Sequence, residues 1–166
     1  MAAEILIRGL ETTDHDSAVE LFLQPRCIWG TLRLPHDSRD DLRKRLENPD
    51  GNRHSIVAVT DGRVVGLVTL VRSAGRRAHA GAIGMFVHDD FQGQGIGRRL
   101  LDACIDLAEN WLGLTRIELD VFTDNVPAIA LYERCGFERE GTARHYALRE
   151  GVLVDAFFMA RVKRSA

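Results

Sequence analysis

The spacing of apolar residues along the chain predicts seven strands and four helices. Alternating or short continuous apolar runs predict strands over residues 4–10, 55–60, 64–72, 82–87, 116–122, 139–149 and 152–162. Apolar residues three and four positions apart predict helices over residues 13–22, 38–47, 96–111 and 125–135. The apolar face of the third helix comprises Ile96, Leu100, Cys104, Leu107 and Trp111. Residues 24–36 are predicted to form an irregular link between the first two helices.

Capping and turn residues mark the ends of these elements. Segments 13–16 and 38–41 have the Ser/Thr-x-x-acid spacing of a capping box at a helix N-terminus. The dipeptides Asp61-Gly62 and Glu150-Gly151 favour tight hairpins between the strands on either side. Because hairpins dominate, we expect a mixed, mostly antiparallel sheet with helices on both faces. This is an α/β (α+β) fold in a single domain of residues 1–166.

The composition is ordinary for a globular protein and argues against several classes. The 166 residues carry a formal net charge of −2, so no basic excess supports binding to nucleic acid or to a membrane surface. No apolar run approaches the roughly 20 residues that span a bilayer, and the N-terminus lacks a signal-peptide layout. The six histidines lack metal-ligand spacing, so we expect no metal site. The odd number of cysteines favours buried thiols in a reducing cytoplasm: Cys27, Cys104 and Cys135.

A glycine-rich turn before the third helix carries the clearest chemical signal. The turn contains Gly93, Gly95 and Gly97. Without Cβ atoms, its backbone N–H groups can approach a ligand closely at a helix N-terminus, where an anion is favoured. Arg98 and Arg99 follow in the first helical turn, where cations are locally unfavourable, so a bound polyanion would resolve the conflict. The competing interpretation pairs these arginines with Asp102 on the same helix.

Other anion-binding motifs fit this turn poorly. A P-loop requires Gly-Lys-Ser/Thr after its glycines, and the turn lacks that sequence. The dinucleotide fingerprint requires a third glycine, but that position holds Arg98 when counted from Gly93 and Leu100 when counted from Gly95. Asp120 lies near the end of a following strand, as a ribose-binding acid would, yet the fingerprint itself fails.

Two segments carry a family resemblance. The pattern Gln92-x-x-Gly95-x-Gly97 resembles the pyrophosphate loop of the GNAT acetyltransferase superfamily. The segment from Asn125 through Tyr132 to Gly136-Phe137 is similar to the second signature of that superfamily. Asn125 and Tyr132 are seven residues apart, almost two helical turns, and therefore share one helix face. The competing interpretation makes Asn125 a helix cap and Tyr132 a half-buried aromatic residue.

The resemblance covers essentially the whole chain and implies a GNAT fold, in which the fourth and fifth strands splay apart and acetyl-CoA enters the gap. The cosubstrate implied is acetyl-CoA, with no metal. The residues that the resemblance implies for binding it are Met85, Phe86, Val87, Gln92, Gly93, Gln94, Gly95, Ile96, Gly97, Arg98 and Asn125. In this superfamily the tyrosine commonly protonates the departing thiolate, so Tyr132 is the expected catalytic residue and general acid.

The chain departs from the family pattern in two places. Asp89 stands where many members have proline. The strand that ends at residue 87 lacks the acidic residue that several relatives use as a general base. The sequence therefore leaves the base open, and each candidate has a competing interpretation as a surface or pairing residue. The candidates are Glu118, Asp120, His79 and His88.

The acceptor is expected to be a small-molecule primary amine. In the superfamily that the chain resembles, the first two helices and their link usually line the acceptor pocket. This link carries an apolar and cationic wall of Trp29, Leu32, Arg33 and Leu34. Arg33 is the expected carboxylate partner, since a guanidinium binds a carboxylate through two hydrogen bonds. The competing interpretations are a solvated surface arginine and apolar residues that simply pack beneath the sheet.

The closing segment 140–161 and Leu34-Pro35-His36 resemble bacterial GNAT proteins described as amino-acid N-acetyltransferases. The expected function is therefore acetylation of the α-amine of a free, apolar amino acid by direct attack on the thioester, in the cytoplasm. The alternatives are a different amine (an aminoglycoside, a phosphinothricin-like compound or a protein N-terminus) and a non-catalytic acyl-CoA sensing module. The presence of Tyr132 disfavours the sensing module, and a homodimer is left open.

Overall fold

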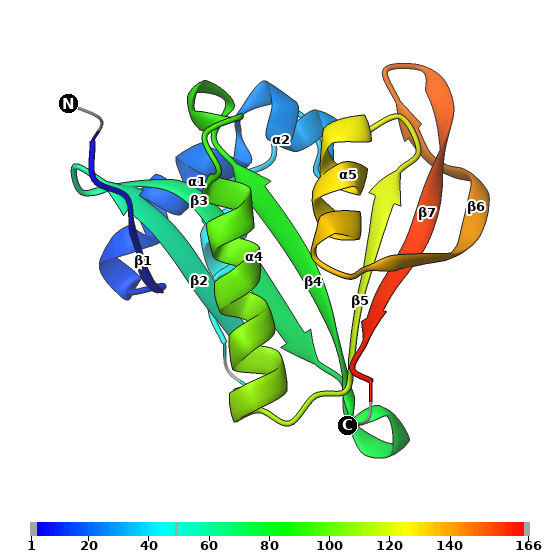
Figure 1. The fold of residues 1–166 in the computed structure, drawn as a ribbon. Coiled ribbons are helices and arrows are strands. Elements are labelled where there is room, and N and C mark those ends of the chain that lie inside the picture. Colours follow the sequence, from blue (N-terminus) through cyan, green and yellow to red (C-terminus); the bar gives the residue numbers. More distant parts are fainter. Residues whose placement is uncertain (1–2, 49, 165–166) are drawn as a thin grey trace.

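A sheet of seven strands in the order β1-β2-β3-β4-β5-β7-β6 forms the middle layer of the molecule (Figure 1). The computed structural model describes residues 3–48 and 50–164. The strands are β1 (Leu6–Gly9), β2 (Arg53–Thr60), β3 (Arg63–Arg72), β4 (Ala80–Val87), β5 (Arg116–Phe122), β6 (Glu138–Arg149) and β7 (Val152–Val162). Strands β4 and β5 pair in parallel, whereas the other neighbours pair antiparallel. The mixed, mostly antiparallel sheet predicted from the sequence is confirmed.

Helices cover both faces of this sheet, as predicted. Helices α4 and α5 lie on one face, and α1 and α2 lie on the other (Figure 1). Helix α3 packs with α1 on that second face. In the described residues the five α-helices are α1 (His15–Phe22), α2 (Pro25–Trp29), α3 (Arg39–Arg45), α4 (Ile96–Asp106) and α5 (Val126–Arg134). Helix α2 begins at a proline, whose fixed φ suits a first helical turn. The prediction of a wholly irregular link was therefore wrong. Within the described part of the chain, no helix is long and apolar enough to cross a membrane.

Local hydrogen bonding moves the predicted start of the first helix and supports the predicted start of the second capped helix. The first capping box lies two residues earlier than predicted, because Asp14 accepts a hydrogen bond from the Glu11 N–H at 2.8 Å and is held by Arg8 at 2.7 and 2.9 Å. The second box is partly confirmed, since the Ser38 hydroxyl accepts a hydrogen bond from the Asp41 N–H at 3.4 Å.

Helix α4 ends earlier than its apolar spacing predicted. Leu107–Trp111 form a π turn, in which the Leu112 N–H donates to the Leu107 carbonyl at 3.0 Å. A π turn contains more residues than an α turn, so it rotates the following side chains about the helix axis. Ala108 is consequently buried, while Trp111 is 77% exposed. The prediction that Trp111 belongs to the buried face was wrong.

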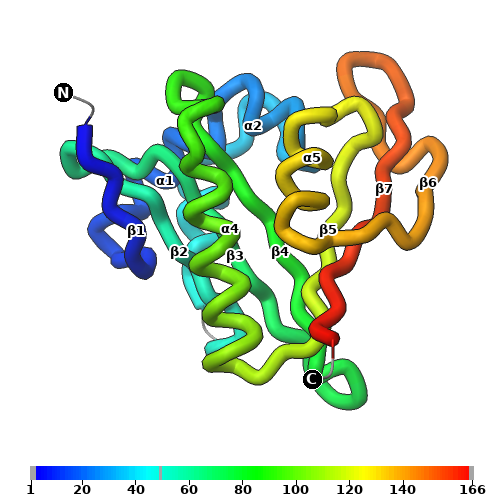
Figure 2. Tube along the Cα trace, in the orientation of Figure 1, coloured from blue at the N-terminus to red at the C-terminus, as the bar shows by residue number. Residues whose placement is uncertain are grey.

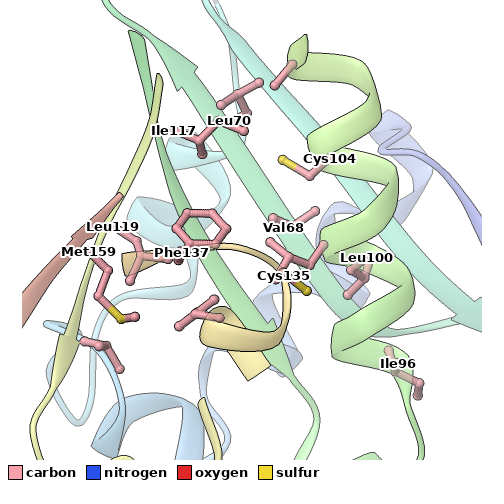
Figure 3. Packing of buried hydrophobic residues seen from close by; sticks show 14 of the residues in the cluster. Val68, Leu70, Ile96, Leu100, Cys104, Ile117, Leu119, Cys135, Phe137 and Met159 are labelled. Atoms are coloured by element: carbon pink, nitrogen blue, oxygen red, sulfur yellow. The ribbon is translucent and has the colours of Figure 1, made fainter. Parts of the chain in front are cut away.

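The main core lies between the sheet and helices α4 and α5. Figure 3 shows Leu100 and Cys104 of α4 pointing toward Val68 of β3, and both α4 residues are almost fully buried. Gly66 of β3 lies beneath this helix, where a Cβ atom would come within 2.8 Å of Leu100 Cδ1 and 3.0 Å of Ile96 Cγ2. This glycine lets α4 approach the sheet closely and so fixes the position of the turn that precedes α4.

The parallel pairing of β4 and β5 is short, which positions the candidate site. It extends from Ala80, opposite Arg116, to Ala82, opposite Glu118. Beyond that pair the two strands separate, as Figures 1 and 2 show. The predicted splay between the fourth and fifth strands is confirmed.

Candidate active site

A cavity of about 620 Å³ lies where β4 and β5 separate, and residues from both faces of the sheet line it. The helices of one face contribute Gly97, Arg98, Leu131 and Tyr132. From the opposite face, α2 and the loop after it contribute Cys27, Gly30, Thr31, Leu32 and Arg33. The cavity thus connects the glycine-rich turn with the link between α1 and α3.

Strand β4 directs part of its main chain toward this cavity. The His88 N–H donates to the Val65 carbonyl of β3 at 2.8 Å. In an antiparallel ladder, main-chain groups alternate between the two sides of a strand. The main chain of Phe86 therefore pairs with β3, and that of Met85 and Val87 points away from β3. The main chain of Met85 and the Val87 N–H therefore face the gap, whereas the Val87 carbonyl accepts hydrogen bonds from Cys27 at 3.4 Å and Gln92 at 3.3 Å. Phe86 lines the cavity without offering its own main-chain groups.

The three glycines of the turn are required for two different reasons. Gly93 and Gly95 have φ angles of 74° and 80°, which side-chain-bearing residues rarely adopt, and a Cβ atom on either would meet nothing within 4 Å. Gly97 has another constraint, because its Cβ atom would lie 3.1 Å from Leu131 Cδ2 and 3.4 Å from Met85 Cε. Gly93 and Gly95 shape the turn, and Gly97 allows α4 to pack closely against α5 and β4.

Some of the hydrogen-bond donors of the two arginines at the start of α4 already have protein partners. The Arg98 Nε donates to both carboxylate oxygens of Asp102, at 2.9 and 3.0 Å. The Arg99 Nη2 donates to the Ile5 carbonyl at 2.9 Å. The pairing of Arg98 with Asp102 that the competing interpretation required is therefore present. Arg98 nevertheless lines the cavity, so its charge acts on whatever binds there.

The other predicted residues of the turn stabilise its conformation. Gln92 lines the cavity, and its side-chain oxygen accepts a hydrogen bond from Arg26 Nη1 at 3.2 Å. Gln94 does not line the cavity; its side-chain nitrogen donates to the Asp90 carbonyl at 3.5 Å. Ile96 is 2% exposed and packs into the core. Gln92 is the member of this group whose polar side chain faces the cavity region.

Asn125 and Tyr132 of the second motif both line the cavity, as their seven-residue spacing suggested. Asn125 is the N-cap residue of α5, but its side chain makes no capping hydrogen bond. Its amide nitrogen instead lies 3.6 Å from the position of a Cβ built on Gly30 of the opposite wall. The capping interpretation explains the position of Asn125 along the chain and leaves its side chain available to a ligand.

Tyr132 is a buried side chain whose hydroxyl has a raised pKa. It is 8% exposed and its ring centroid lies 5.7 Å from that of Phe137. Burial, followed by the nearby charges of Asp120 and Cys135, raises the pKa of Tyr132 to about 12. The hydroxyl therefore stays protonated over the whole neutral range, as a proton donor must.

Two of the candidate bases lie on β5, and the structure separates them. Glu118 accepts hydrogen bonds from Arg116 Nε at 2.6 Å and from Arg77. Burial favours a higher pKa for Glu118, but the two guanidinium groups outweigh it and hold the pKa below its ordinary value. Asp120 lines the cavity and accepts a hydrogen bond from the Tyr146 hydroxyl at 3.1 Å. Asp120 is thus the acid of β5 that lines the cavity.

The two candidate histidines lie outside the cavity wall. His88 is 3% exposed, with its Nε2 atom 2.8 Å from Arg63 Nη2 and its Nδ1 atom accepting from the Asp90 N–H at 3.1 Å. His79 is exposed near the start of β4, at the end where β4 and β5 remain paired. Neither histidine is positioned to take a proton from a ligand in the gap.

The link between α1 and α3 contributes only part of the acceptor wall that the sequence predicted. Leu32 and Arg33 line the cavity. Trp29 does not line the cavity. Its ring centroid lies 3.9 Å from the Cζ atom of Arg149, which belongs to β6. Leu34 also lies outside the wall and is 66% exposed. The interpretation of Trp29 as a packing residue is the one that the contacts support.

Arg33 is half-buried rather than solvated, so the interpretation as a surface arginine was wrong. Its Cζ atom lies 3.9 Å from the Phe22 ring centroid and 5.0 Å from that of Phe86. Its Nε and Nη1 atoms are buried and have no hydrogen-bond partner among the described residues. Burial, followed by the charge of Arg45, lowers the pKa of Arg33 to about 10, which still leaves a cation at neutral pH.

Several cavity residues were not predicted, Arg45 and Cys27 among them. Arg45, near the end of α3, reaches the cavity through the packing of that helix, and no local pattern marks it. Cys27 lines the cavity, and its thiol donates to the Val87 carbonyl at 3.4 Å. Burial raises the pKa of Cys27 to about 12, so its thiol is not a nucleophile at neutral pH. All three cysteines are buried and free, as predicted.

Comparison with known proteins gives consistent matches over the whole fold. The acetyltransferase (GNAT) family model matches residues 18–137. L-amino acid N-acetyltransferase AaaT of Escherichia coli (strain K12) is 42% identical over 162 residues, which is 97% of this chain and 99% of that protein. The structure of an acetyltransferase of the GNAT family from Streptococcus pneumoniae matches with a TM-score of 0.81 at 26% identity, covering 96% of this chain and 99% of that one. YncA from Salmonella typhimurium, solved with its cofactor acetyl-CoA, matches in fold with a TM-score of 0.84 at 21% identity, covering 98% of this chain and 95% of that one.

Proposed function

Because this chain belongs to the acetyltransferase (GNAT) family, we propose that it transfers the acetyl group of acetyl-CoA to the α-amine of a free L-amino acid. Family membership makes it an acetyl-CoA-dependent N-acetyltransferase. The amino-acid acceptor and the roles of individual residues are our proposal. Support for the acceptor class comes from the E. coli relative, which is named an L-amino acid N-acetyltransferase and matches nearly the whole chain.

The glycine-rich turn binds the pyrophosphate of coenzyme A in this proposal. The positive φ angles of Gly93 and Gly95 let successive backbone N–H groups converge at the N-terminus of α4, where the helix dipole favours an anion. Arg98 adds positive charge at the cavity wall. The pantetheine arm then follows β4 into the gap, where the outward-facing main chain of Met85 and Val87 and the amide of Asn125 provide hydrogen-bonding groups.

The reaction is direct attack of a neutral amine on the thioester. The amine nitrogen forms a bond to the carbonyl carbon, and a main-chain N–H of β4 stabilises the negative charge that develops on the carbonyl oxygen. When the carbon–sulfur bond breaks, the coenzyme A thiolate takes the proton of the Tyr132 hydroxyl. Coenzyme A leaves as the thiol, and the tyrosinate that remains regains a proton from solvent before the next turnover, because its pKa of about 12 lies far above neutral pH.

Asp120 is the base that removes the proton of the amine, directly or through a water molecule. It lines the cavity on β5, whereas Glu118 is held by two arginines and the two histidines lie outside the wall. An amino acid arrives at neutral pH largely as its ammonium form, so the rate depends on deprotonation. We expect activity to rise between about pH 6 and pH 9 as the amine loses its proton.

The observation that carries this function is the cavity at the separation of β4 and β5. One wall holds a turn suited to a pyrophosphate and a buried tyrosine, and the other holds an apolar loop with a half-buried arginine. A donor and a small acceptor can therefore meet at the gap in the sheet.

Turnover measurements with a panel of amines test the acceptor class. Release of coenzyme A is followed at saturating acetyl-CoA with free L-amino acids, their amides, aminoglycosides, polyamines and a peptide N-terminus. We expect a free amino acid to give the highest kcat/KM. A higher value for any other class would reassign the acceptor. A protein that binds coenzyme A tightly and acetylates none of these amines would instead fit the sensing module.

A further inference from the structure

The guanidinium of Arg33 is a half-buried cation with unused hydrogen-bond donors. Its Cζ atom lies 3.9 Å from the centroid of the Phe22 ring and 5.0 Å from the centroid of the Phe86 ring. These aromatic contacts stabilise the charge through the ring faces but satisfy no N–H group. The buried Nε and Nη1 atoms have no partner among the described residues. Buried donors without partners are rare in proteins, because each costs free energy that a hydrogen bond would recover.

The surroundings of Arg33 favour an anion as the missing partner. Arg45 lines the same cavity, and the positive charges of Arg45 and Arg53 both lower the pKa of Arg33. The negative charge of Asp37 raises the pKa of Arg33. The carboxylate of Asp37 accepts a hydrogen bond from the Leu34 N–H at 3.3 Å. Arg33 and Asp37 form no ion pair within 4.0 Å among the described residues. The positive charge is therefore not neutralised within this wall.

The geometry of a guanidinium selects a planar anion with two oxygens. Each of its two binding edges contains Nη2 together with either Nε or Nη1. Protein atoms cover Nε and Nη1, so a carboxylate approaches through Nη2, and a small shift of the side chain completes the two-point contact. The position also suits an amino acid. Arg33 packs against Phe86 of β4, next to Met85 and Val87, whose main chain faces the gap. An α-amine and its carboxylate are separated by one carbon atom, so an anchored carboxylate holds the amine close to β4.

We propose that Arg33 binds the α-carboxylate of the acceptor and thereby makes this enzyme select free amino acids over amines that lack a carboxylate. The inference rests on the proposed acetylation of amino acids and adds the residue that determines this specificity. Phe22 and Phe86 hold the guanidinium in place before the acceptor arrives, so that little side-chain entropy is lost on binding.

Kinetics of Arg33→Gln and Arg33→Lys with matched acceptors test this role. The acceptors are the free L-amino acid that the wild type acetylates most efficiently and the carboxamide of the same amino acid. We expect Arg33→Gln to raise KM for the free amino acid by about 10- to 100-fold, from the loss of charge-assisted hydrogen bonds. KM for the amide and KM for acetyl-CoA should change little. Arg33→Lys keeps the charge and loses the planar fork, so its effect should be intermediate.

Two control variants separate direct contact from the general effect of charge. Arg76→Gln removes a positive charge from an exposed turn that does not line the cavity, and should leave both KM values unchanged. Arg45→Gln removes a neighbouring cavity charge, and its effect should be clearly smaller than that of Arg33→Gln. Calorimetric titration of the amino acid into coenzyme A-saturated protein gives a readout without turnover. Thermal unfolding of each variant checks its fold.

The outcomes distinguish this inference from the proposed function. If the wild type acetylates no free amino acid, the proposed function fails. If it does, and the Arg33 variants change KM equally for the acid and the amide or for neither, Arg33 is a structural residue and the inference alone is wrong. Equal losses for Arg45→Gln and Arg33→Gln would also overturn it, in favour of a diffuse electrostatic effect. If Arg33→Gln does not fold, the same acid-to-amide comparison with Arg33→Lys decides.

Discussion

At the scale of single residues, the buried hydroxyl of Tyr132 tests the mechanism most directly. Tyr132→Phe deletes one oxygen and keeps the ring beside Phe137. Since the pKa of Tyr132 is raised to about 12, the hydroxyl of the wild type carries its proton at assay pH and can donate it to the thiolate. We expect kcat to fall about 100-fold without that donor. Calorimetry should show retained affinity for coenzyme A. Equal kcat in both proteins, with chemistry shown to be rate-limiting, would remove Tyr132 from the mechanism.

A second prediction at this scale concerns the role of Asp120 as the base. Asp120→Asn keeps the size of the side chain and an acceptor for the Tyr146 hydroxyl, but removes the basic oxygen. We expect kcat/KM at neutral pH to fall by about 10- to 100-fold and to recover partly at high pH, where the amine is already neutral. Glu118→Gln, two residues away on the same strand and outside the cavity wall, is the matched control. A pH–rate profile of Asp120→Asn that parallels the wild type would contradict the assignment.

Sequence alone could nominate residues for the site but could not rank all of them. Tyr132 and Asn125 could be paired by spacing, because a helix fixes which residues share a face. The four candidate bases could not be separated, since the arginines that hold Glu118 come partly from a distant turn. Likewise, the burial of Arg33 depends on Phe22 and Phe86, which lie on other elements.

At the scale of elements, the turn before α4 makes the next prediction. Gly95 and Gly113 have similar φ angles, 80° and 69°, and a Cβ atom on either would meet nothing within 4 Å. Alanine at either position should therefore cost a similar backbone strain of about 1–2 kcal/mol. We expect only Gly95→Ala to weaken coenzyme A binding, by about 10-fold or more, because only this glycine aims N–H groups at the proposed pyrophosphate site. Equal affinities of the two variants, measured by calorimetry, would argue against a pyrophosphate at this turn.

Elements with local turn signals were predicted well. The hairpins around Asp61-Gly62 and Glu150-Gly151 form where predicted, because all four residues adopt the positive φ angles that such turns require. The end of α4 was not predicted, since the π turn changes the helical period that the apolar spacing assumed. Helix α2 was also missed, because five residues are too few for a periodic pattern.

At the scale of the whole molecule, Arg8 and Asp14 connect the edge strand β1 to the start of α1, and this pair predicts acid sensitivity. Two hydrogen bonds from Arg8 hold the pKa of Asp14 below its ordinary value. A lowered pKa means that the pair stabilises the folded state above about pH 4, and that this stabilisation is lost as the pH falls through the folded-state pKa. We expect Asp14→Asn to lower the free energy of unfolding by about 2 kcal/mol at pH 7.

Denaturant unfolding between pH 7 and pH 2.5 checks this prediction. The difference between Asp14→Asn and the wild type should shrink toward acid pH, because the wild-type carboxylate is then also neutral. Asp16→Asn is the control: its carboxylate also pairs with an arginine, Arg43, but its side chain is 84% exposed. Such a surface pair should contribute less than about 1 kcal/mol. A pH-independent difference for Asp14→Asn would show that the carboxylate charge is not the cause.

The order of the elements could be predicted from the sequence, but the arrangement of the sheet could not be derived from it in full. Hairpins join neighbours in sequence, so local signals predict β2 beside β3 and β6 beside β7. The position of β7 between β5 and β6 depends on long-range pairing. The separation of β4 and β5 was expected through the family resemblance alone, because no local pattern shows where two parallel strands stop pairing.

The cavity lined from both faces of the sheet has a consequence for the order of events. In the proposed function, donor and acceptor occupy different ends of one space, so neither would have to leave before the other binds. A ping-pong route would need an acylated side chain, and the cavity thiol, Cys27, has a pKa of about 12. Initial-velocity plots should therefore intersect, as for a ternary complex. Free coenzyme A should compete with acetyl-CoA without competing with the amine.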